Sequence, residues 1–311
     1  MPKKEAIFDF PRPVDNESPI GHDAVLRAFA DAWAKRDNYP IHPVWLLTGP
    51  KGIGKATIAY KLARRIFSDV SGRAESEIAE QMSVGGIGDL FVADLEHNIT
   101  DNKATKYISI ETIRSMIGKM QMSSMAESWR VAIIDSIDEL SDKTPNALLK
   151  TLEEPPAKTI FFLIAHSLDR VPPTVRSRSR VEKMRPLPNM EIREIAARLL
   201  PGRDLSPDLI KISGGSFGRI AAMFATGADE LFGDALRVCA SESSNSSDYL
   251  LLAKKIAKNP ENMSILPDVI AHMGIAELYP SAVRDIERAN VLHLDMETTA
   301  YKIITEINRR A

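Results

Sequence analysis

Gly49-Pro-Lys-Gly-Ile-Gly-Lys55 stands directly after a short apolar run, Val44–Leu47, and fits the pattern G-x-x-x-x-G-K. The residues that follow, 53–67, carry apolar side chains at helical spacing. A strand before such a loop and a helix after it form the context that a phosphate-binding P-loop requires. Glycines let the backbone close around phosphate groups, while the helix-start amides and the lysine neutralise their charge. The alternative is a glycine-rich turn ahead of an ordinary helix. The P-loop interpretation predicts nucleotide contacts from Gly49, Gly52, Gly54 and Lys55.

The chain around this loop alternates apolar strands with helical patterns. Two further apolar runs, Val131–Ile134 and Ile160–Ala165, are typical of buried strands, and a helical pattern at Pro145–Glu153 lies between them. Such alternation predicts an α/β fold built on a parallel sheet. The segment 68–106 is polar and contains several glycines, so we expect a surface insertion there. Beyond two prolines near residue 188, the pattern indicates helices and turns.

The position after Lys55 lacks a side chain that P-loops use. A Ser or Thr normally follows the lysine, because its hydroxyl holds Mg²⁺. Here that residue is Ala56. Thr57 comes next, but one helical step rotates it by about 100° from that position. We therefore expect weak nucleotide binding and still weaker hydrolysis, with Thr57 retained as a candidate contact.

The second strand carries a matching defect. Val131-Ala-Ile-Ile-Asp135 resembles a Walker B strand, which places Asp135 to contact Mg²⁺ through water. Related ATPases follow this Asp with a Glu that activates the attacking water, whereas this chain has Ser136. A serine cannot act as a general base at neutral pH, because its hydroxyl is far too weak an acid. Asp138 and Glu139 follow out of register, and we expect them to be solvated carboxylates at a helix start.

Two further motifs resemble those of one family. Asn146-Ala-Leu-Leu-Lys-Thr-Leu-Glu-Glu-Pro-Pro156 is followed by Pro172-Pro-Thr-Val-Arg-Ser-Arg-Ser179. This order resembles the AAA+ subunits of bacterial clamp loaders, most of all their delta-prime members, over about residues 20–225. The resemblance implies an α/β, RecA-like P-loop AAA+ domain with a parallel sheet, then a small helical lid and a helical C-terminal collar domain. We expect these domains at residues 1–182, 183–228 and 229–311.

The resemblance also gives two arginines a role. In the family, the arginine at the position of Arg178 reaches across an interface to ATP held by a neighbour, where its guanidinium stabilises charge on the γ-phosphate. The alternative is an ordinary surface arginine, because the loop is rich in Arg and Lys. Gly214-Gly-Ser-Phe-Gly-Arg219 resembles the sensor-2 segment, so Arg219 would face a nucleotide in its own subunit. Its alternative is a solvated arginine beside a helix cap.

The chain departs from the family pattern at three places. Ser179 replaces the usual Cys and leaves the arginine in place. The polar residue of the sensor-1 strand falls at His166 or Ser167, so its role is open. Many delta-prime proteins hold a four-cysteine zinc module, whereas Cys239 is the single cysteine here; we expect no zinc and no other metal.

Composition limits the function further. The chain has 311 residues, of which 44% are hydrophobic and 26% charged, with a net charge of −2. That charge gives no global field for nucleic acid. No apolar run approaches the roughly 20 residues of a membrane span. We expect a cytoplasmic protein that does not bind membranes.

The resemblance implies one subunit of the clamp loader of the DNA polymerase III holoenzyme, a component of the polymerase assembly and not the polymerase. Its partners would be the gamma/tau and delta subunits, the sliding clamp, and primed DNA through the complex. It would be a stator that donates Arg178 to a neighbour. Its own ATPase would be absent or very weak, with at most a weak or vestigial site for ATP or ADP. Two alternatives stay open: an ATP-hydrolysing motor subunit of the same loader, and an unrelated P-loop nucleotide-dependent enzyme.

Overall fold

The computed structural model describes residues 10–95, 107–122, 128–140, 144–203, 205–241 and 243–310. They form two compact units. The sheet unit comprises residues 11–195 together with Ser216–Gly218, and the helical unit comprises most of the rest, residues 196–215 and 219–310. This division is coarser than the three predicted domains, whose boundaries stay a prediction.

The sheet unit is built on five parallel strands in the order β2-β3-β4-β1-β5. The strands are β1 Val44–Thr48, β2 Leu90–Asp94, β3 Arg130–Asp135, β4 Thr159–Ala165 and β5 Arg180–Lys183. Every residue of β1 and β4 is buried, because both faces of a parallel sheet are covered. The central strands end at a common edge, since Thr48 pairs with Ala165 and Asp135 with Ile164. This confirms the predicted parallel α/β sheet.

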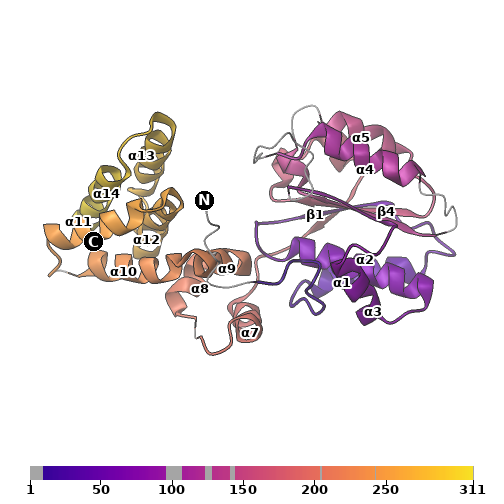
Figure 1. Cartoon of the computed structure of the whole chain (residues 1–311), viewed down its shortest axis with the longest axis horizontal. Coiled ribbons are helices and arrows are strands. Elements are labelled where there is room, and N and C mark those ends of the chain that lie inside the picture. The colour runs from indigo at the N-terminus through magenta and orange to yellow at the C-terminus, as the bar shows by residue number, and fades with distance from the viewer. Residues whose placement is uncertain are drawn as a thin grey trace. The chain divides into compact units, whose positions relative to one another are not determined.

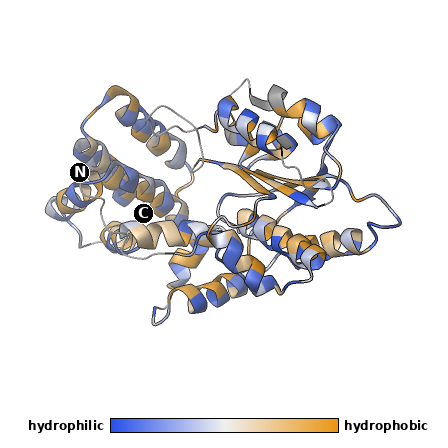
Figure 2. Ribbon diagram, turned by 45° about the vertical axis from the view of Figure 1, so that its right-hand side comes forward, coloured by the Kyte–Doolittle hydropathy of each residue, from blue (hydrophilic) through white to orange (hydrophobic). Residues whose placement is uncertain are grey.

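Helices cover both faces of this sheet (Figure 1). One face packs against α1 Asp23–Ala34, α2 Lys55–Ser71 and α3 Glu75–Ser83. The other face packs against α4 Ile110–Met122 and α5 Thr144–Glu153. Figure 2 shows the strands as a largely hydrophobic layer between the two sets of helices. Three short elements complete the unit: η1 Ile137–Glu139, η2 Leu168–Arg170 and α6 Pro173–Arg176.

The segment 68–106 is not the surface insertion that its composition predicts. It holds α3, whose Ile78, Ala79 and Met82 are buried, and β2, which forms one edge of the sheet. β2 holds an apolar run of four residues, 90–93, but this short run stands in a polar segment with several glycines, so the composition of the whole segment hid the strand. Residues 96–106 lie outside the described residues.

The described part of the helical unit contains helices and turns. α7 Asn189–Leu199 leads into it, and α9 Phe217–Thr226 begins in the sheet unit. Its other elements are α8 Pro207–Ser213, α10 Ala228–Ala240, α11 Ser246–Ala257, η3 Pro260–Ser264, α12 Ile265–Met273, α13 Tyr279–Leu292 and α14 Met296–Arg310. Cys239 is buried in α10, and burial raises the pKa of its thiol to about 12. No helix in the described ranges is both long and apolar enough to cross a membrane.

Candidate functional site

The P-loop runs from the carboxyl end of β1 to the start of α2. Three of its glycines have positive φ angles: 156° at Gly49, 78° at Gly52 and 98° at Gly54. No side chain fits at Gly49, because a Cβ atom there would lie 2.3 Å from the carbonyl oxygen of Met184. α2 begins at Lys55 without a side-chain cap, and the first N–H groups of a helix have no partner within it. The loop therefore has the backbone geometry and the helix start with which P-loops bind phosphate.

Lys55 lies inside this loop. Its ammonium group donates to the carbonyl oxygen of Gly49 at 2.7 Å and to that of Pro50 at 2.6 Å. The residue is only 4% exposed, so these bonds offset the cost of removing the charge from water. The lysine holds the loop in shape, and a phosphate group would compete with the two carbonyls for the same donor.

The start of α9 closes one side of the loop. The Ser216 hydroxyl donates to the carbonyl of Lys51 at 2.9 Å, and the Gly218 N–H donates to the carbonyl of Gly52 at 2.9 Å. The two backbones touch, because a Cβ atom at Gly218 would lie 2.7 Å from the Cα of Gly52. The sequence did not predict this contact, although Ser216 and Gly218 belong to the segment 214–219 that resembles sensor 2.

His22 anchors the loop from the other side. Its Nε2 donates to the carbonyl of Ile53 at 2.7 Å, and the residue is 6% exposed. Burial is the largest influence on the imidazole and lowers its pKa. Sequence reasoning missed His22 because its partner is a backbone carbonyl 31 positions away, which leaves no side-chain motif.

Ala56 and Ser136 stand where active ATPases have a Mg²⁺ ligand and a base, and the side chains of both pack inside the protein. Ala56 contributes its methyl group to the core around α2, and Thr57 is half-buried beside it. Asp135 is the last residue of β3, and β4 alone lies between β3 and β1. Asp135 and the P-loop therefore both lie at the carboxyl ends of the parallel strands. Ser136 is 1% exposed, with its Oγ 3.4 Å from the Nε2 of His166. The carboxylate that would activate water is replaced here by a buried hydroxyl.

Asp138 is not the solvated carboxylate that the sequence predicts. It is half-buried, and its oxygens accept the backbone N–H of His166 at 3.0 and 2.9 Å and that of Ser167 at 3.0 Å. It therefore ties the turn after β3 to the end of β4. Because it binds the backbone of His166 and not the ring, Ser136, His166 and Asp138 do not form a nucleophilic triad.

Arg178 lies in the turn between α6 and β5. One terminal nitrogen, Nη2, pairs with Oε1 of Glu153 at 2.5 Å, and the other, Nη1, donates to the carbonyl of Thr174 at 2.9 Å. The side chain is 35% exposed. Its neighbour Arg180 is held differently, by Glu182 at 2.8 Å and by the face of the Trp45 ring. The arginines of this loop therefore occupy distinct environments.

Arg178 and the P-loop lie at opposite ends of the β1–β5 ladder. In that ladder Trp45 pairs with Arg180 and Thr48 pairs with Lys183. Arg178 precedes the amino end of the ladder, whereas the P-loop follows its carboxyl end. The paired segment spans about 10 Å at the usual rise of a strand. The guanidinium is thus directed to the edge of the sheet that does not carry the nucleotide loop of the same chain.

Arg219 belongs to the helical unit. Its guanidinium pairs with Asp268 of α12 and donates to the carbonyl of Ile212 at 2.8 Å. Burial raises the pKa of the Asp268 carboxyl, against the opposing influence of this arginine. Ser216 and Gly218 of this stretch contact the P-loop, and the role of Arg219 toward a nucleotide stays a prediction.

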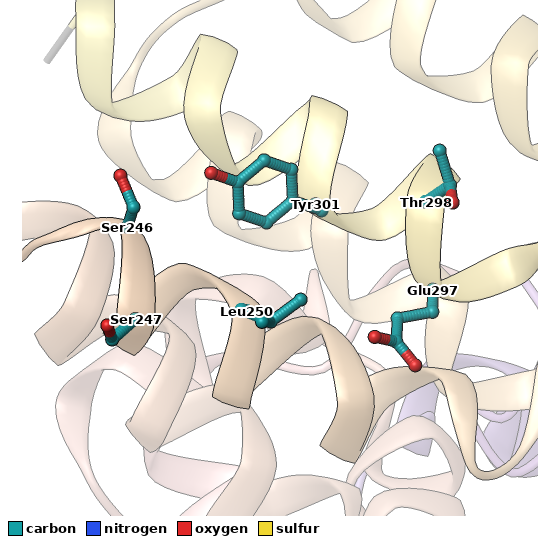
Figure 3. Close-up of a pocket in the computed structure, with 6 residues that line it drawn as sticks. All are labelled: Ser246, Ser247, Leu250, Glu297, Thr298 and Tyr301. Carbon is teal, nitrogen blue, oxygen red and sulfur yellow. The ribbon is translucent and has the colours of Figure 1, made fainter.

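A pocket of about 330 Å³ lies in the helical unit between the first turns of α11 and α14. Figure 3 shows the residues of the two helices that face it: Ser246, Ser247, Leu250, Glu297, Thr298 and Tyr301. None of the predicted site residues lines this pocket.

Known proteins resemble the chain, and the matching family model falls within the sheet unit. The family described as DNA polymerase III, delta subunit, matches residues 22–188, a span that includes the P-loop, Asp135 and Arg178. The DNA polymerase III subunit delta' of Pseudomonas aeruginosa is 31% identical over 179 residues, 55% of this chain and 52% of that protein. The DNA polymerase III subunit gamma of Buchnera aphidicola subsp. Schizaphis graminum is 27% identical over 207 residues, 65% of this chain and 54% of that protein.

Among solved structures, a DNA polymerase III gamma subunit-related protein of Thermotoga maritima matches with a TM-score of 0.47 at 13% identity, over 93% of this chain and 98% of that one. The chain spans about half the length of the curated relatives it matches first. The family match covers more than half of the 311 residues and confirms the resemblance carried by the sequence motifs. The chain therefore belongs to the DNA polymerase III delta-subunit family.

Proposed function

We propose that this chain is a clamp-loader subunit of the DNA polymerase III holoenzyme and works in the cytoplasm. In that assembly it would join gamma/tau and delta subunits to load the sliding clamp onto primed DNA. It acts as a stator that donates Arg178 to the ATP of a neighbouring subunit, while the neighbours hydrolyse the ATP. Family membership and the delta' and gamma relatives support the assembly.

The position of Arg178 just before β5, at the amino end of the β1–β5 ladder, is the observation that supports the finger role. An arginine that precedes β5 stands at the amino end of the ladder and so lies away from the P-loop of its own chain. A nucleotide that it contacts would have to come from another subunit. A guanidinium at a γ-phosphate stabilises the charge that develops in phosphoryl transfer.

The nucleotide site of this chain supports only a vestigial role. Its loop is shaped for phosphate, but Ala56 offers no Mg²⁺ ligand and Ser136 offers no base. We infer that this site binds ATP or ADP only weakly. Hydrolysis of ATP in this chain is absent or very slow.

Replacing Arg178 by alanine tests the finger. In a loader rebuilt with clamp and primed DNA, Arg178→Ala should lower steady-state ATP turnover by about a thousandfold at the dependent site. Affinity for the other subunits should change little. Arg170→Ala and Arg176→Ala are the controls, because both residues belong to the same basic segment. Arg180→Ala is unsuitable, since it would also remove the contact with Trp45.

If Arg178 is only part of a basic patch, the three variants should show equal, mild losses that shrink with added salt. That outcome would leave the loop as an interface or DNA-attracting surface and would contradict the finger.

A further inference from the structure

Glu153 stands where helix energetics does not favour a carboxylate. It is the last residue of α5, and the carboxyl end of a helix carries partial negative charge that favours cations. Its side chain meets the guanidinium of Arg178 at 2.5 Å, which compensates that charge. A carboxylate at this position does not stabilise the helix, but it does form the ion pair with Arg178.

The pair holds Arg178 in a folded-back conformation. Nη2 is engaged by Glu153, and Nη1 is engaged by the Thr174 carbonyl of the preceding short helix. Both terminal nitrogens that would grip a phosphate are thus bound to acceptors of the same chain. Carboxylates and phosphates are both bound by the planar guanidinium, and a side chain folded back onto Glu153 has to leave this carboxylate before it can extend to a phosphate on a neighbour.

The exchange is accessible because neither partner is deeply buried. The side chains are 35% exposed for Arg178 and 46% exposed for Glu153. An ion pair this exposed shifts an equilibrium by a small factor, about fivefold at most. Such a pair can withdraw the arginine without preventing its engagement by a phosphate of higher charge.

We propose that Glu153 is a positioning residue that docks Arg178 on its own subunit until the nucleotide of a neighbour displaces the carboxylate. This inference rests on the proposed finger role of Arg178. Glu153 then suppresses ATP turnover in loaders that have not yet met clamp and DNA, when the finger is engaged only part of the time.

The experiment uses the rebuilt loader and measures ATP turnover with and without clamp and primed DNA. Glu153→Gln removes the charge and keeps the shape. It should raise the rate without clamp and DNA by about two- to fivefold, and should change the stimulated rate less. Glu154→Gln is the matched control, because it removes the same charge from the same helix end at an exposed residue outside the ion pair. It should leave both rates unchanged.

Two further variants separate docking from a structural effect. In Glu153→Gln/Arg178→Ala the rate should equal that of Arg178→Ala alone, because the carboxylate acts only through the arginine. Glu153→Asp, which keeps the charge, should lie closer to the wild type than Glu153→Gln does.

Each remaining outcome is decisive. If Arg178→Ala lowers turnover but Glu153→Gln leaves it unchanged or lowers it, the docking role is wrong and the finger stands. If Arg178→Ala leaves turnover unchanged, the proposed function and this inference fall together. If Glu153→Gln raises the rate equally in the Arg178→Ala background, the effect does not pass through the ion pair and the docking role is wrong.

Discussion

Ala56 and Ser136 replace two chemically different functions, a Mg²⁺ ligand and a base, in two separate elements. Each now serves packing: the alanine lies against the core of the sheet unit, and the serine is 1% exposed beside His166. Restoring a glutamate at position 136 would place a carboxylate where almost no solvent reaches, which is costly without partners. The residues around the end of β3 are therefore packed closely about a small side chain.

The isolated chain should release phosphate from ATP at background rate, because both functions are missing. The measurement is steady-state phosphate release with excess Mg²⁺ and ATP. Lys55→Ala, prepared in the same way, is the control for contaminating ATPases. A turnover near 1 s⁻¹, which lies within the usual enzyme range, would contradict the expectation if Lys55→Ala abolished it. That result would support the motor-subunit alternative.

His22 should make the fold sensitive to acid. Its pKa in the folded chain is lowered from 6.5, chiefly by burial, so the unfolded chain binds the proton more tightly. Stability therefore rises with pH between the lowered value and 6.5, and it is lost as pH falls through this window. His22→Gln keeps a donor for Ile53 and removes the titration, so its urea midpoint should fall less between pH 8 and pH 5.

The control for this comparison is His293→Gln. It makes the same substitution at an exposed position that also has a positive φ angle, 51° against 61° at His22. If wild type and His22→Gln lose the same stability on acidification, His22 does not contribute to the acid sensitivity.

Some strands could be predicted from the sequence, and others could not. β1, β3 and β4 are central strands with continuous apolar runs, so their pattern predicted both strand and parallel sheet. The two edge strands were not predicted. The apolar run of β2 stands in a polar segment with several glycines, and three of the four residues of β5 are charged. β5 lies at the edge of the sheet and none of its residues is fully buried, so its sequence carries little apolar signal.

The residues of the candidate site likewise fall into those that the sequence predicted and those that it did not. Candidate residues that belong to a motif, such as Lys55 and Asp135, could be found because their spacing is fixed along the chain. His22, Gly218 and Glu153 could not, since each makes its contact with a distant segment that only the fold brings near. Asp138 was misjudged because its partners are backbone N–H groups at the end of another strand.

The contact between α9 and the P-loop can be tested with a pair of glycine substitutions. Gly218→Ala would place a Cβ 2.7 Å from the Cα of Gly52, so we expect it to destabilise the fold by about 1–3 kcal/mol. Gly233→Ala in α10 meets no atom within 4 Å and should stabilise its helix by about 0.5–1 kcal/mol. Urea unfolding measures both. Equal stabilisation by the two substitutions would mean that α9 does not rest on the loop.

On the scale of the whole chain, the sheet separates two groups of candidate site residues. One edge carries the P-loop and Asp135, and the opposite end of the β1–β5 ladder carries Arg178 with its partner Glu153. This separation is what the proposed function requires, because the arginine would serve a neighbour while the P-loop would remain with the nucleotide site of its own chain. Ala56 and Ser136, which depart from the motifs of active ATPases, stand beside the P-loop and Asp135 in the sequence, whereas Arg178 matches the family motif.

The central claim is that this chain contributes an arginine and not a working ATPase site. The most direct measurement compares Lys55→Ala with Arg178→Ala in the same rebuilt loader, with steady-state ATP turnover recorded in the presence of clamp and primed DNA. We predict that Lys55→Ala retains nearly the wild-type rate, while Arg178→Ala falls by about a thousandfold at the dependent site. The reverse order, with severe loss from Lys55→Ala and little from Arg178→Ala, would contradict the account.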